Sequence, residues 1–307
     1  MLLRELSPDY LILLNLFRDQ LDRYGEINSI AANWKKALEK LTNKSTIILN
    51  ADDPQIAYLA KGTKANTQYF GLQQSQFTTH TNKNAADSVS CPNCGTKLIF
   101  NAIAFSHLGD WHCPKCKLKR PEVQKEKFVI YPLPGLYNKY NILAALYVLK
   151  RMNIEHAAIE EAFTNFKPAF GRQEIIAYKN KLIQIFLSKN PTSFNQSYAT
   201  MKELGAKTLL IVLNDRIPDG RDVSWIWDTE LPELKGFTNV LVAGDRVYDM
   251  ALRIKYEEYK NVKTFENLEK AINTGVDLLQ ENETLFILPT YSAMLDVRKI
   301  VTGKKIL

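Results

Sequence analysis

The four cysteines of this chain are the feature that most restricts its fold. They form two C-P-x-C pairs, Cys91 with Cys94 and Cys113 with Cys116, in the pattern C-x2-C-x18-C-x2-C. Each pair is a tight turn that can offer two thiolates to one metal ion, and four thiolates complete a tetrahedral shell without an open catalytic position. The spacing therefore predicts a structural Zn²⁺ held by these four side chains.

Two alternatives exist for the cysteines. His107 and His112 lie inside the loop and are possible competing ligands, although four cysteines already complete the set. Disulfides are the other alternative, and a cytoplasmic setting disfavours them. The chain has no apolar run of about 18 residues, and Arg4, Glu5 and Asp9 interrupt any secretory signal. We therefore expect a cytoplasmic protein.

Apolar runs alternate with helical patterns along the rest of the chain, which is typical of α/β folds with parallel sheets. A length of 307 residues with 46% hydrophobic residues allows two domains. We expect strands at 10–17, 46–53, 68–72, 182–187, 208–214, 239–245 and 284–290, and a β-like run at 128–133. We expect helices at 18–41, from near Asn138 to 150, and at 193–204, 246–258, 267–280 and 292–302.

The domain boundary is predicted at the linker 165–171, where Pro168 and Gly171 punctuate the chain. The first domain then covers 1–168, with the four cysteines in an insertion at 88–121. The second domain, 169–307, reads as a doubly wound, Rossmann-like α/β fold.

Two carboxamides mark the start of the helix that follows Gly135. Asn138 and Asn141 lie three residues apart, so both project from the first turn on one face. Next to a glycine they suit a planar ligand such as adenine, whereas the alternative is that Asn138 only caps the helix. Asp52 and Asp53 end an earlier strand, where they form either a turn or part of a ligand site.

The second domain places several segments on one rim, because ligands gather at the carboxyl ends of parallel strands. These segments are 189–195, 214–222, 245–246 and 290–291. Lys189, with the helix start near Ser193 and Asn195, is a candidate anion site, and capping by Ser193 alone is the alternative. The aspartates of the turn-rich run 214–228 form Asx-turns or carry function. Its alternating Val223, Trp225 and Trp227 also suit a core strand.

Six segments in this order resemble the MurT-type synthetase subunits of the Mur ligase family. They are NLFRDQLDRYGE at 15–26, PGLYNKYN at 134–141, FGRQE at 170–174, LSKNPTSFNQ at 187–196, NDRIPDGRDVSWIWD at 214–228 and TYSAMLDVR at 290–298. The resemblance covers nearly the whole chain. It implies a Mur ligase-like central domain with an inserted zinc ribbon, followed by a Mur ligase-like C-terminal domain.

The resemblance also implies a function. ATP, with Mg²⁺, phosphorylates the α-carboxyl of D-glutamate in the lipid II stem peptide, and ammonia from a GatD-type glutaminase converts it to D-isoglutamine at the inner face of the membrane. Asn138 and Asn141 then contact the nucleotide, and Arg172 faces it from the second domain, unless Arg172 only forms a salt bridge. Asp222, or alternatively Asp219, completes the Cys–His pair of the glutaminase.

One element of such an ATPase is missing from the sequence. The phosphate loop G-x-x-x-x-G-K-[ST] is absent, and the only Gly-Lys pair is Gly303-Lys304. Members of the family carry this loop upstream of 15–26, so we expect the chain to lack that N-terminal segment and to be inactive alone.

Two other hypotheses remain. A Mur or folylpolyglutamate-type ligase adds an amino acid and needs no glutaminase. A zinc-ribbon nucleic-acid binder uses Lys115, Lys117, Lys119 and Arg120, whereas the amidating ligase needs no nucleic acid. The formal net charge of +7 suits attraction to a membrane surface or phosphorylated substrate, or simply a solvated basic surface.

Overall fold

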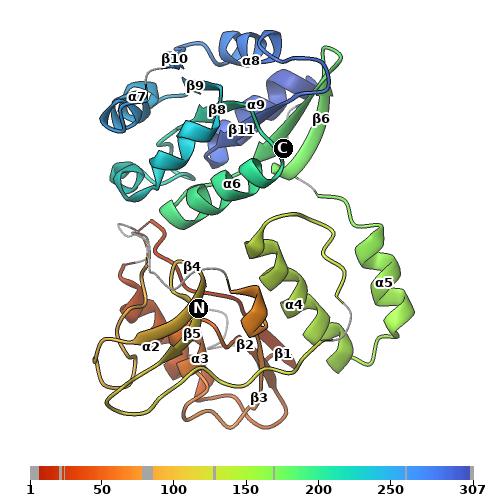
Figure 1. Ribbon diagram of the computed structural model, residues 1–307. Helices are drawn as coiled ribbons and strands as arrows, with labels where there is room; N and C mark the ends of the chain where they lie inside the picture. Colours follow the sequence, from red (N-terminus) through yellow and green to blue (C-terminus); the bar gives the residue numbers. More distant parts are fainter. Residues whose placement is uncertain are drawn as a thin grey trace. The chain divides into compact units, whose positions relative to one another are not determined.

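The computed structural model describes residues 7–20, 23, 25–77, 86–126, 129–168, 170–259 and 261–304 (Figure 1). The chain divides into two compact units, Met1–Phe166 (unit 1) and Lys167–Leu307 (unit 2). The two units share no sheet and no hydrophobic core cluster among the described residues, and each is described by itself.

Unit 1 is built on a three-stranded parallel sheet in the order β1-β2-β3. The strands are β1 (Tyr10–Leu13), β2 (Thr46–Asn50) and β3 (Asn66–Phe70). The middle strand is buried along its whole length, as its run of β-branched and apolar residues favours. Its alternating side chains serve two cores, Ile47 and Leu49 on one face and Ile48 on the other.

The helices of unit 1 cover both faces of this sheet. Residues of α2 (Ile27–Leu38) and α3 (Pro54–Tyr58) share a core with Ile47 and Leu49. The long helix α4 (Leu136–Arg151) packs Tyr140, Leu143, Ala144 and Tyr147 into the core that contains Ile48. Helix α5 (His156–Thr164) packs Ile159 and Phe163 against Leu146 of α4.

The insertion in unit 1, which we call the four-cysteine module (88–121), contains an antiparallel hairpin. Its strands are β4 (Ile99–Phe105) and β5 (Leu108–His112), and a short 3₁₀ helix, η2 (Gln74–Gln76), precedes the module. Gly109 allows the two strands to approach, because a Cβ there would lie 2.2 Å from the carbonyl oxygen of Ala102. Isolated bridges Ser90↔Lys97 and His112↔Lys119 extend the pairing around the cysteines.

Unit 2 is built on a six-stranded sheet in the order β10-β9-β8-β11-β7-β6. Its strands are β6 (Arg172–Tyr178), β7 (Lys181–Phe186), β8 (Thr208–Val212), β9 (Asn239–Ala243), β10 (Val262–Thr264) and β11 (Thr284–Pro289). Five strands run parallel, and β6 pairs with β7 as an antiparallel hairpin.

Helices cover both faces of this second sheet (Figure 1). One core joins the sheet to α6 (Pro191–Glu203), α7 (Val247–Tyr256) and the 3₁₀ helices η3 (Ser224–Asp228) and η4 (Leu231–Gly236). The opposite core joins it to α8 (Leu268–Asp277) and α9 (Tyr291–Thr302). The doubly wound arrangement predicted for the second half is thus present. Among the described residues, no helix combines the length and apolar character needed to span a membrane.

Several local predictions were wrong. Residues 129–133 form no strand, and Phe128 lies outside the described residues. The helix predicted at 18–41 is α2 only, from Ile27; residues 21, 22 and 24 of that range are likewise not described. The hairpin strand β6 was not predicted, because its two-residue turn uses Lys179 and Asn180, with φ values of 48° and 60°, and lysine conceals the turn signal.

The run Val223 to Asp228 is also not a strand. Residues Ser224–Asp228 form η3, in which Ile226 is buried. Trp225, and Val223 just before the helix, pack against the same core. Successive side chains of a 3₁₀ helix are rotated by about 120°, so they do not alternate between two faces as the side chains of a strand do. The alternation of Val223, Trp225 and Trp227 therefore misled the sequence-based prediction of a core strand. Trp227, which that prediction placed in the core, is 47% exposed.

Candidate functional site

The four cysteines of the module come together in space. Their sulfur atoms all lie within 4.8 Å of one another, with 3.5 Å between Cys91 Sγ and Cys116 Sγ and between Cys94 Sγ and Cys113 Sγ. Four sulfurs at about 2.3 Å from a tetrahedral Zn²⁺ lie about 3.8 Å apart. The geometry therefore fits one closed four-thiolate metal site.

The environment of these thiols is uneven. Burial raises the pKa of Cys91 to about 12, whereas the hydrogen bond with the Thr96 hydroxyl lowers the pKa of Cys94 to about 6. A hydrogen bond with Asn93 lowers the pKa of Cys116. His107 is not part of the cluster: it is completely buried, with Nε2 3.4 Å from Asp53 Oδ2. The possible competition from histidine is thus not supported at His107.

Asp52 lies just beyond the carboxyl end of β2 and is 0% exposed. Its Oδ1 accepts a hydrogen bond of 2.7 Å from Arg120 Nε, and its Oδ2 accepts bonds from the Tyr140 hydroxyl (2.7 Å) and the Leu72 amide (2.9 Å). Burial raises the pKa of Asp52, and the Arg120 guanidinium acts against this rise. The carboxylate therefore ties β2, α4 and the four-cysteine module together.

Asp53 has a different local role. Its Oδ1 accepts bonds from the amides of Gln55 (2.9 Å) and Ile56 (3.2 Å), so it is the N-cap of α3, with Pro54 at the first helical position. Its Oδ2 accepts a bond from the Leu16 amide at 2.8 Å. Both aspartates of the predicted strand tip are therefore buried and engaged within the protein.

Asn138 and Asn141 lie in the first two turns of α4. The N-cap position is Gly135, with φ of 94°, so Asn138 is not the cap. Its Nδ2 donates to the carbonyl oxygen of Pro134 at 2.7 Å, and its Oδ1 accepts from Asn141 Nδ2 at 3.3 Å. Asn138 is 7% exposed, whereas Asn141 is exposed. The two carboxamides are paired with each other, as their spacing predicted.

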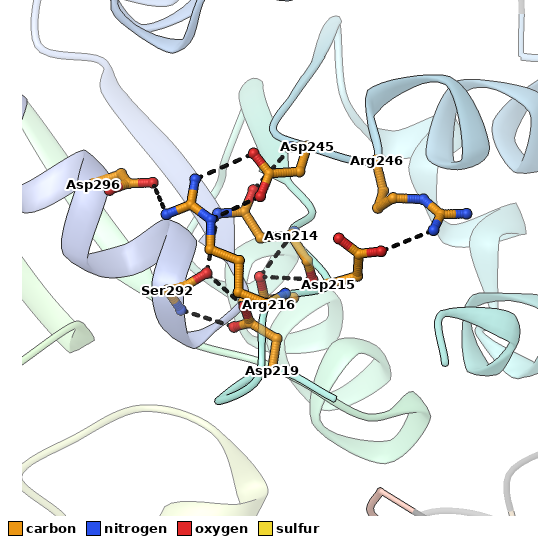
Figure 2. A network of polar contacts seen from close by, with 9 residues as sticks. Asn214, Asp215, Arg216, Asp219, Asp245, Arg246, Ser292 and Asp296 are labelled. Carbon is orange, nitrogen blue, oxygen red and sulfur yellow. Dashed lines mark hydrogen bonds and ion pairs between the residues drawn. The ribbon is translucent and has the colours of Figure 1, made fainter. Parts of the chain in front are cut away.

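The rim of unit 2 is a network of polar side chains at the carboxyl ends of β8, β9 and β11 (Figure 2). Asn214 is its centre: its amide donates to Thr290 Oγ1 (3.0 Å), and its Nδ2 donates to Ser292 Oγ (3.1 Å). Asn214 Oδ1 accepts from the Asp245 amide at 2.9 Å. Gly244 is needed here, because a Cβ would lie 2.5 Å from the Leu213 oxygen. The predicted convergence is therefore present for the segments 214–222, 245–246 and 290–291, and these contacts do not include 189–195.

Two arginines at the rim each bind two carboxylates. Figure 2 shows Arg216 with Asp245 and Asp296, and Arg246 with Asp215. Arg216 donates to both oxygens of Asp245 (2.7 and 3.1 Å) and lies 2.9 Å from Asp296. Arg246 donates to Asp215 (2.8 Å) and to both oxygens of Asp249 (2.7 and 2.9 Å). These bonds raise the pKa values of both guanidinium groups, and Arg246 lowers the pKa of Asp249. The rim is thus a partly exposed ionic network.

The two aspartates proposed for partner catalysis differ in exposure. Asp219 is 3% exposed, and it accepts bonds from the Ser292 amide (2.7 Å), the Ser292 hydroxyl (2.5 Å) and the Arg216 amide (3.2 Å). It therefore fastens the loop to the first turn of α9. Asp222 is exposed; its Oδ1 accepts a 2.8 Å bond from the Ser224 amide, which lowers its pKa.

The remaining predicted residues lie elsewhere in unit 2. Arg172 begins β6 and is exposed. Asn195 Oδ1 accepts from the Glu230 amide at 2.8 Å, which holds α6 to the segment before η4. Lys189 is partly buried, just before α6, whose N-cap is Asn190 rather than Ser193. Asn190 Oδ1 accepts from the Ser193 amide at 2.8 Å, so that amide already has a partner.

Sequence reasoning did not identify Arg120 and Arg216 as organising residues. Arg120 stands at the end of a basic run, which conceals its pairing with the distant Asp52. Arg216 was part of the predicted rim, but its partners Asp245 and Asp296 are separated from it by 29 and 80 residues. Pairings between residues so far apart in the sequence are visible only in the folded structure.

Each of the two units matches a known protein family. The family described as "Mur ligase middle domain" matches residues 2–149, and the family described as "MurT ligase C-terminal" matches residues 187–294. Together the two matches take in most of unit 1 and most of unit 2.

Curated relatives agree with this assignment. The "Lipid II isoglutaminyl synthase (glutamine-hydrolyzing) subunit MurT" of Staphylococcus aureus is 32% identical over 278 residues, covering 83% of this chain and 62% of the relative. The protein of the same name from Streptococcus pneumoniae is 29% identical over 325 aligned residues, covering 98% and 71%. The chain thus spans about three-fifths to seven-tenths of the length of these relatives.

Solved structures show the same fold at low identity. A pseudomurein peptide ligase type C from Methanothermus fervidus has a TM-score of 0.72 at 20% identity, over 96% of this chain and 63% of that one. MurF ligase from Thermotoga maritima, solved in complex with ADP, has a TM-score of 0.60 at 14% identity, over 97% and 62%. The likeness extends through both units.

Proposed function

The chain belongs to the Mur ligase family, in its MurT group, and we propose that the protein is the synthetase subunit of an ATP-dependent amidating ligase of peptidoglycan synthesis. In the proposed reaction, ATP transfers its terminal phosphoryl group to the α-carboxylate of the stem-peptide D-glutamate of lipid II. Ammonia attacks the resulting acyl phosphate, phosphate leaves, and D-isoglutamine remains. Phosphorylation supplies the leaving group, and positioning supplies much of the remaining acceleration.

The proposed source of ammonia is a GatD-type glutaminase partner, and the exposed Asp222 carries this proposal. An aspartate that orients the histidine of another subunit must be accessible and ionised at neutral pH. Asp222 meets both conditions, since it is exposed and its pKa is lowered, whereas Asp219 is buried with both carboxylate oxygens engaged. The structure therefore favours Asp222 over Asp219 for this role.

The test is the substitution Asp222→Asn in the intact complex with its glutaminase. The change keeps the size of the side chain and removes its charge, so the histidine loses its acidic partner. We expect glutamine hydrolysis to fall by orders of magnitude, while assembly and amidation from free ammonium persist. The matched control is Asp228→Asn, in the same 214–228 run. Equal glutaminase activity in Asp222→Asn and wild type would exclude the shared triad.

We propose that the nucleotide contacts unit 1 through the start of α4. Gly135, with φ of 94°, is the N-cap of α4, and the exposed Asn141 is hydrogen-bonded to Asn138. Losing an amide that binds a base weakens affinity by about 5- to 150-fold, so Asn138→Ala should raise the ATP requirement of the full-length complex. An unchanged ATP affinity would limit Asn138 to its bond with Pro134. Among the described residues, the four cysteines are the one group of three or more histidine, cysteine or carboxylate side chains arranged to hold a metal, so we assign Mg²⁺ no ligands.

We also propose that the metal of the four-cysteine module is a structural Zn²⁺, as the closed set of thiolates indicates. The rival hypothesis of nucleic-acid binding loses one of its four basic residues, because Arg120 points its guanidinium at the buried Asp52. An electrophoretic shift of DNA or RNA at low salt that is lost on neutralising Lys115, Lys117 and Lys119 would favour that rival.

A further inference from the structure

The side chain of Arg120 extends from the four-cysteine module to the buried Asp52 of unit 1. Its Nε and one terminal nitrogen each lie 2.7 Å from Asp52 Oδ1, and the same terminal nitrogen donates to the carbonyl oxygen of Leu72 at 2.7 Å. The arginine side chain is 13% exposed and the aspartate 0%. Within unit 1 this is a desolvated ion pair, in which the loss of either partner leaves a buried charge.

The fit around this pair leaves no spare room. Gly71 stands beside it, and a Cβ at that position would lie 2.4 Å from Asp52 Oδ1 and 3.0 Å from an Arg120 nitrogen. Glycine is thus required here for close approach rather than for an unusual φ value. The pair depends on the chain following β3 as well as on its own two residues.

The position of Arg120 depends on the turn that contains Cys113 and Cys116. Arg120 follows Cys116 by four residues, and the turn is closed by bonds from the Lys117 amide to the Cys113 oxygen (3.2 Å) and from the Cys113 amide to the Leu118 oxygen (2.7 Å). The Arg120 amide then donates to the Trp111 oxygen at 2.9 Å. A metal on Cys113 and Cys116 therefore fixes the segment that presents the guanidinium.

The module also touches the strand tip directly. The Trp111 indole N–H donates to the Ala51 oxygen at 3.0 Å, and the Gly109 amide donates to the Asp52 oxygen at 3.0 Å. Trp111 is 1% exposed. Through these contacts the module packs directly against the segment that contains Asp52.

The far side of Asp52 is α4. The Tyr140 hydroxyl donates to Asp52 Oδ2 at 2.7 Å, and Tyr140 is 1% exposed. Tyr140 follows Asn138 by two residues, so this bond fixes the turn of α4 that carries the two carboxamides. A connected path of hydrogen bonds thus leads from the metal-binding turn through Arg120, Asp52 and Tyr140 to the start of α4.

We propose that Arg120 is a positioning residue through which the metal of the four-cysteine module sets the first turns of α4. The coupling itself requires no nucleotide. Only its consequence for ATP rests on the proposed function, because that function places the nucleotide at Asn138. The module then does more than stabilise its own fold. Loss of its metal loosens α4, although none of the four cysteines lies in that helix.

The experiment measures amide hydrogen exchange in the full chain, with zinc content recorded in parallel. Arg120→Gln should keep about one zinc per chain, while exchange of residues 140–147 in α4 and of Leu72 accelerates by roughly 10- to 100-fold, as expected when a buried hydrogen-bonded partner is lost. Lys119→Gln removes the same charge from the adjacent, exposed position and should keep wild-type rates. Arg120→Lys keeps the charge but not the forked geometry, and should restore protection only in part.

Removal of zinc with a strong chelator supplies the second arm. In wild type it should accelerate the same α4 amides, and in Arg120→Gln it should add little, because both changes break one path. Gly71→Ala, whose methyl group displaces the pair while both partners keep their identity, should reproduce the exchange pattern if Arg120→Gln does not fold. Wild-type α4 exchange in Arg120→Gln, or after zinc removal, would overturn the proposal.

ATP affinity of the full-length complex separates this inference from the proposed function. A weaker ATP affinity in Arg120→Gln, with α4 loosened, supports both. Loosened α4 with unchanged ATP affinity would leave the positioning role intact and remove the proposed nucleotide contact at Asn138.

Discussion

Both units place arginine–aspartate pairs just beyond the carboxyl ends of parallel strands, but the two arrangements are built differently. In unit 1, Asp52 is buried and Arg120 nearly so, and each has a fixed set of neighbours. In unit 2, the Arg216 and Asp245 side chains are 47% and 40% exposed, and each arginine of the rim is shared between two carboxylates.

The difference lies in the surrounding dielectric. Breaking a buried ion pair leaves a charge without a partner in the protein interior, so such a pair favours one arrangement strongly. An exposed pair is screened by water and contributes little to stability. We infer that unit 1 uses its pair to fix the module and α4 in one position. The ion pairs at the rim of unit 2 can exchange partners at low energetic cost.

The largest effect should follow from breaking the metal site. Cys94→Ser removes one thiolate, and the remaining three cannot close the shell. Structural zinc contributes about 10–16 kcal/mol of apparent binding energy in small domains, so we expect zinc to be lost and the free energy of unfolding of unit 1 to fall by more than about 3 kcal/mol. Metal analysis and urea denaturation measure both. Full zinc content in the variant would contradict a four-thiolate site.

The next test compares the two pairs directly. Asp52→Asn leaves the Arg120 guanidinium without a counter-charge and should cost about 3–5 kcal/mol. The matched change Asp245→Asn at the exposed rim should cost no more than about 1 kcal/mol. Chemical denaturation of both variants under one set of conditions gives the comparison, and equal losses would show that burial does not distinguish the pairs.

A smaller effect is expected from the one buried carboxylate of the rim loop. Asp219→Ala removes the acceptor for the Ser292 amide and hydroxyl, and should cost about 1–3 kcal/mol. The start of α9 should also lose protection in amide exchange. Asp222→Ala, three residues away and exposed, should leave the stability of unit 2 within about 0.5 kcal/mol of wild type. The reverse order would exchange the structural assignments of these aspartates.

The smallest effect concerns the acid stability of the rim. Arg246 lowers the pKa of Asp249 below its ordinary value of 3.8, so this pair stabilises the fold above that pH, and its contribution is lost as the pH falls. Arg246→Gln should therefore lower stability at pH 7 by no more than about 1 kcal/mol, and the difference from wild type should shrink as the pH falls below the lowered pKa of Asp249. A difference that persisted at low pH would require another cause than this ion pair.

Much of this architecture was readable from local patterns. The apolar runs predicted β2, β8, β9 and β11, because continuous burial on both faces requires continuous apolar residues. The spacing of the four cysteines predicted their convergence, since a tight turn fixes each pair. Edge strand β6 escaped, because an exposed strand needs no apolar run and its turn lacks the usual glycine.

The sequence by itself therefore determined the elements whose signals are local: buried strands, cysteine turns and amphipathic helices. Only the tertiary structure decided which carboxylate meets which cation. Arg120 and Asp52 are 68 residues apart, and nothing local distinguishes Arg120 from its lysine neighbours or Asp219 from Asp222. The physical reason is that burial converts an ordinary charge into one that must have a particular partner, and burial is a property of the whole fold.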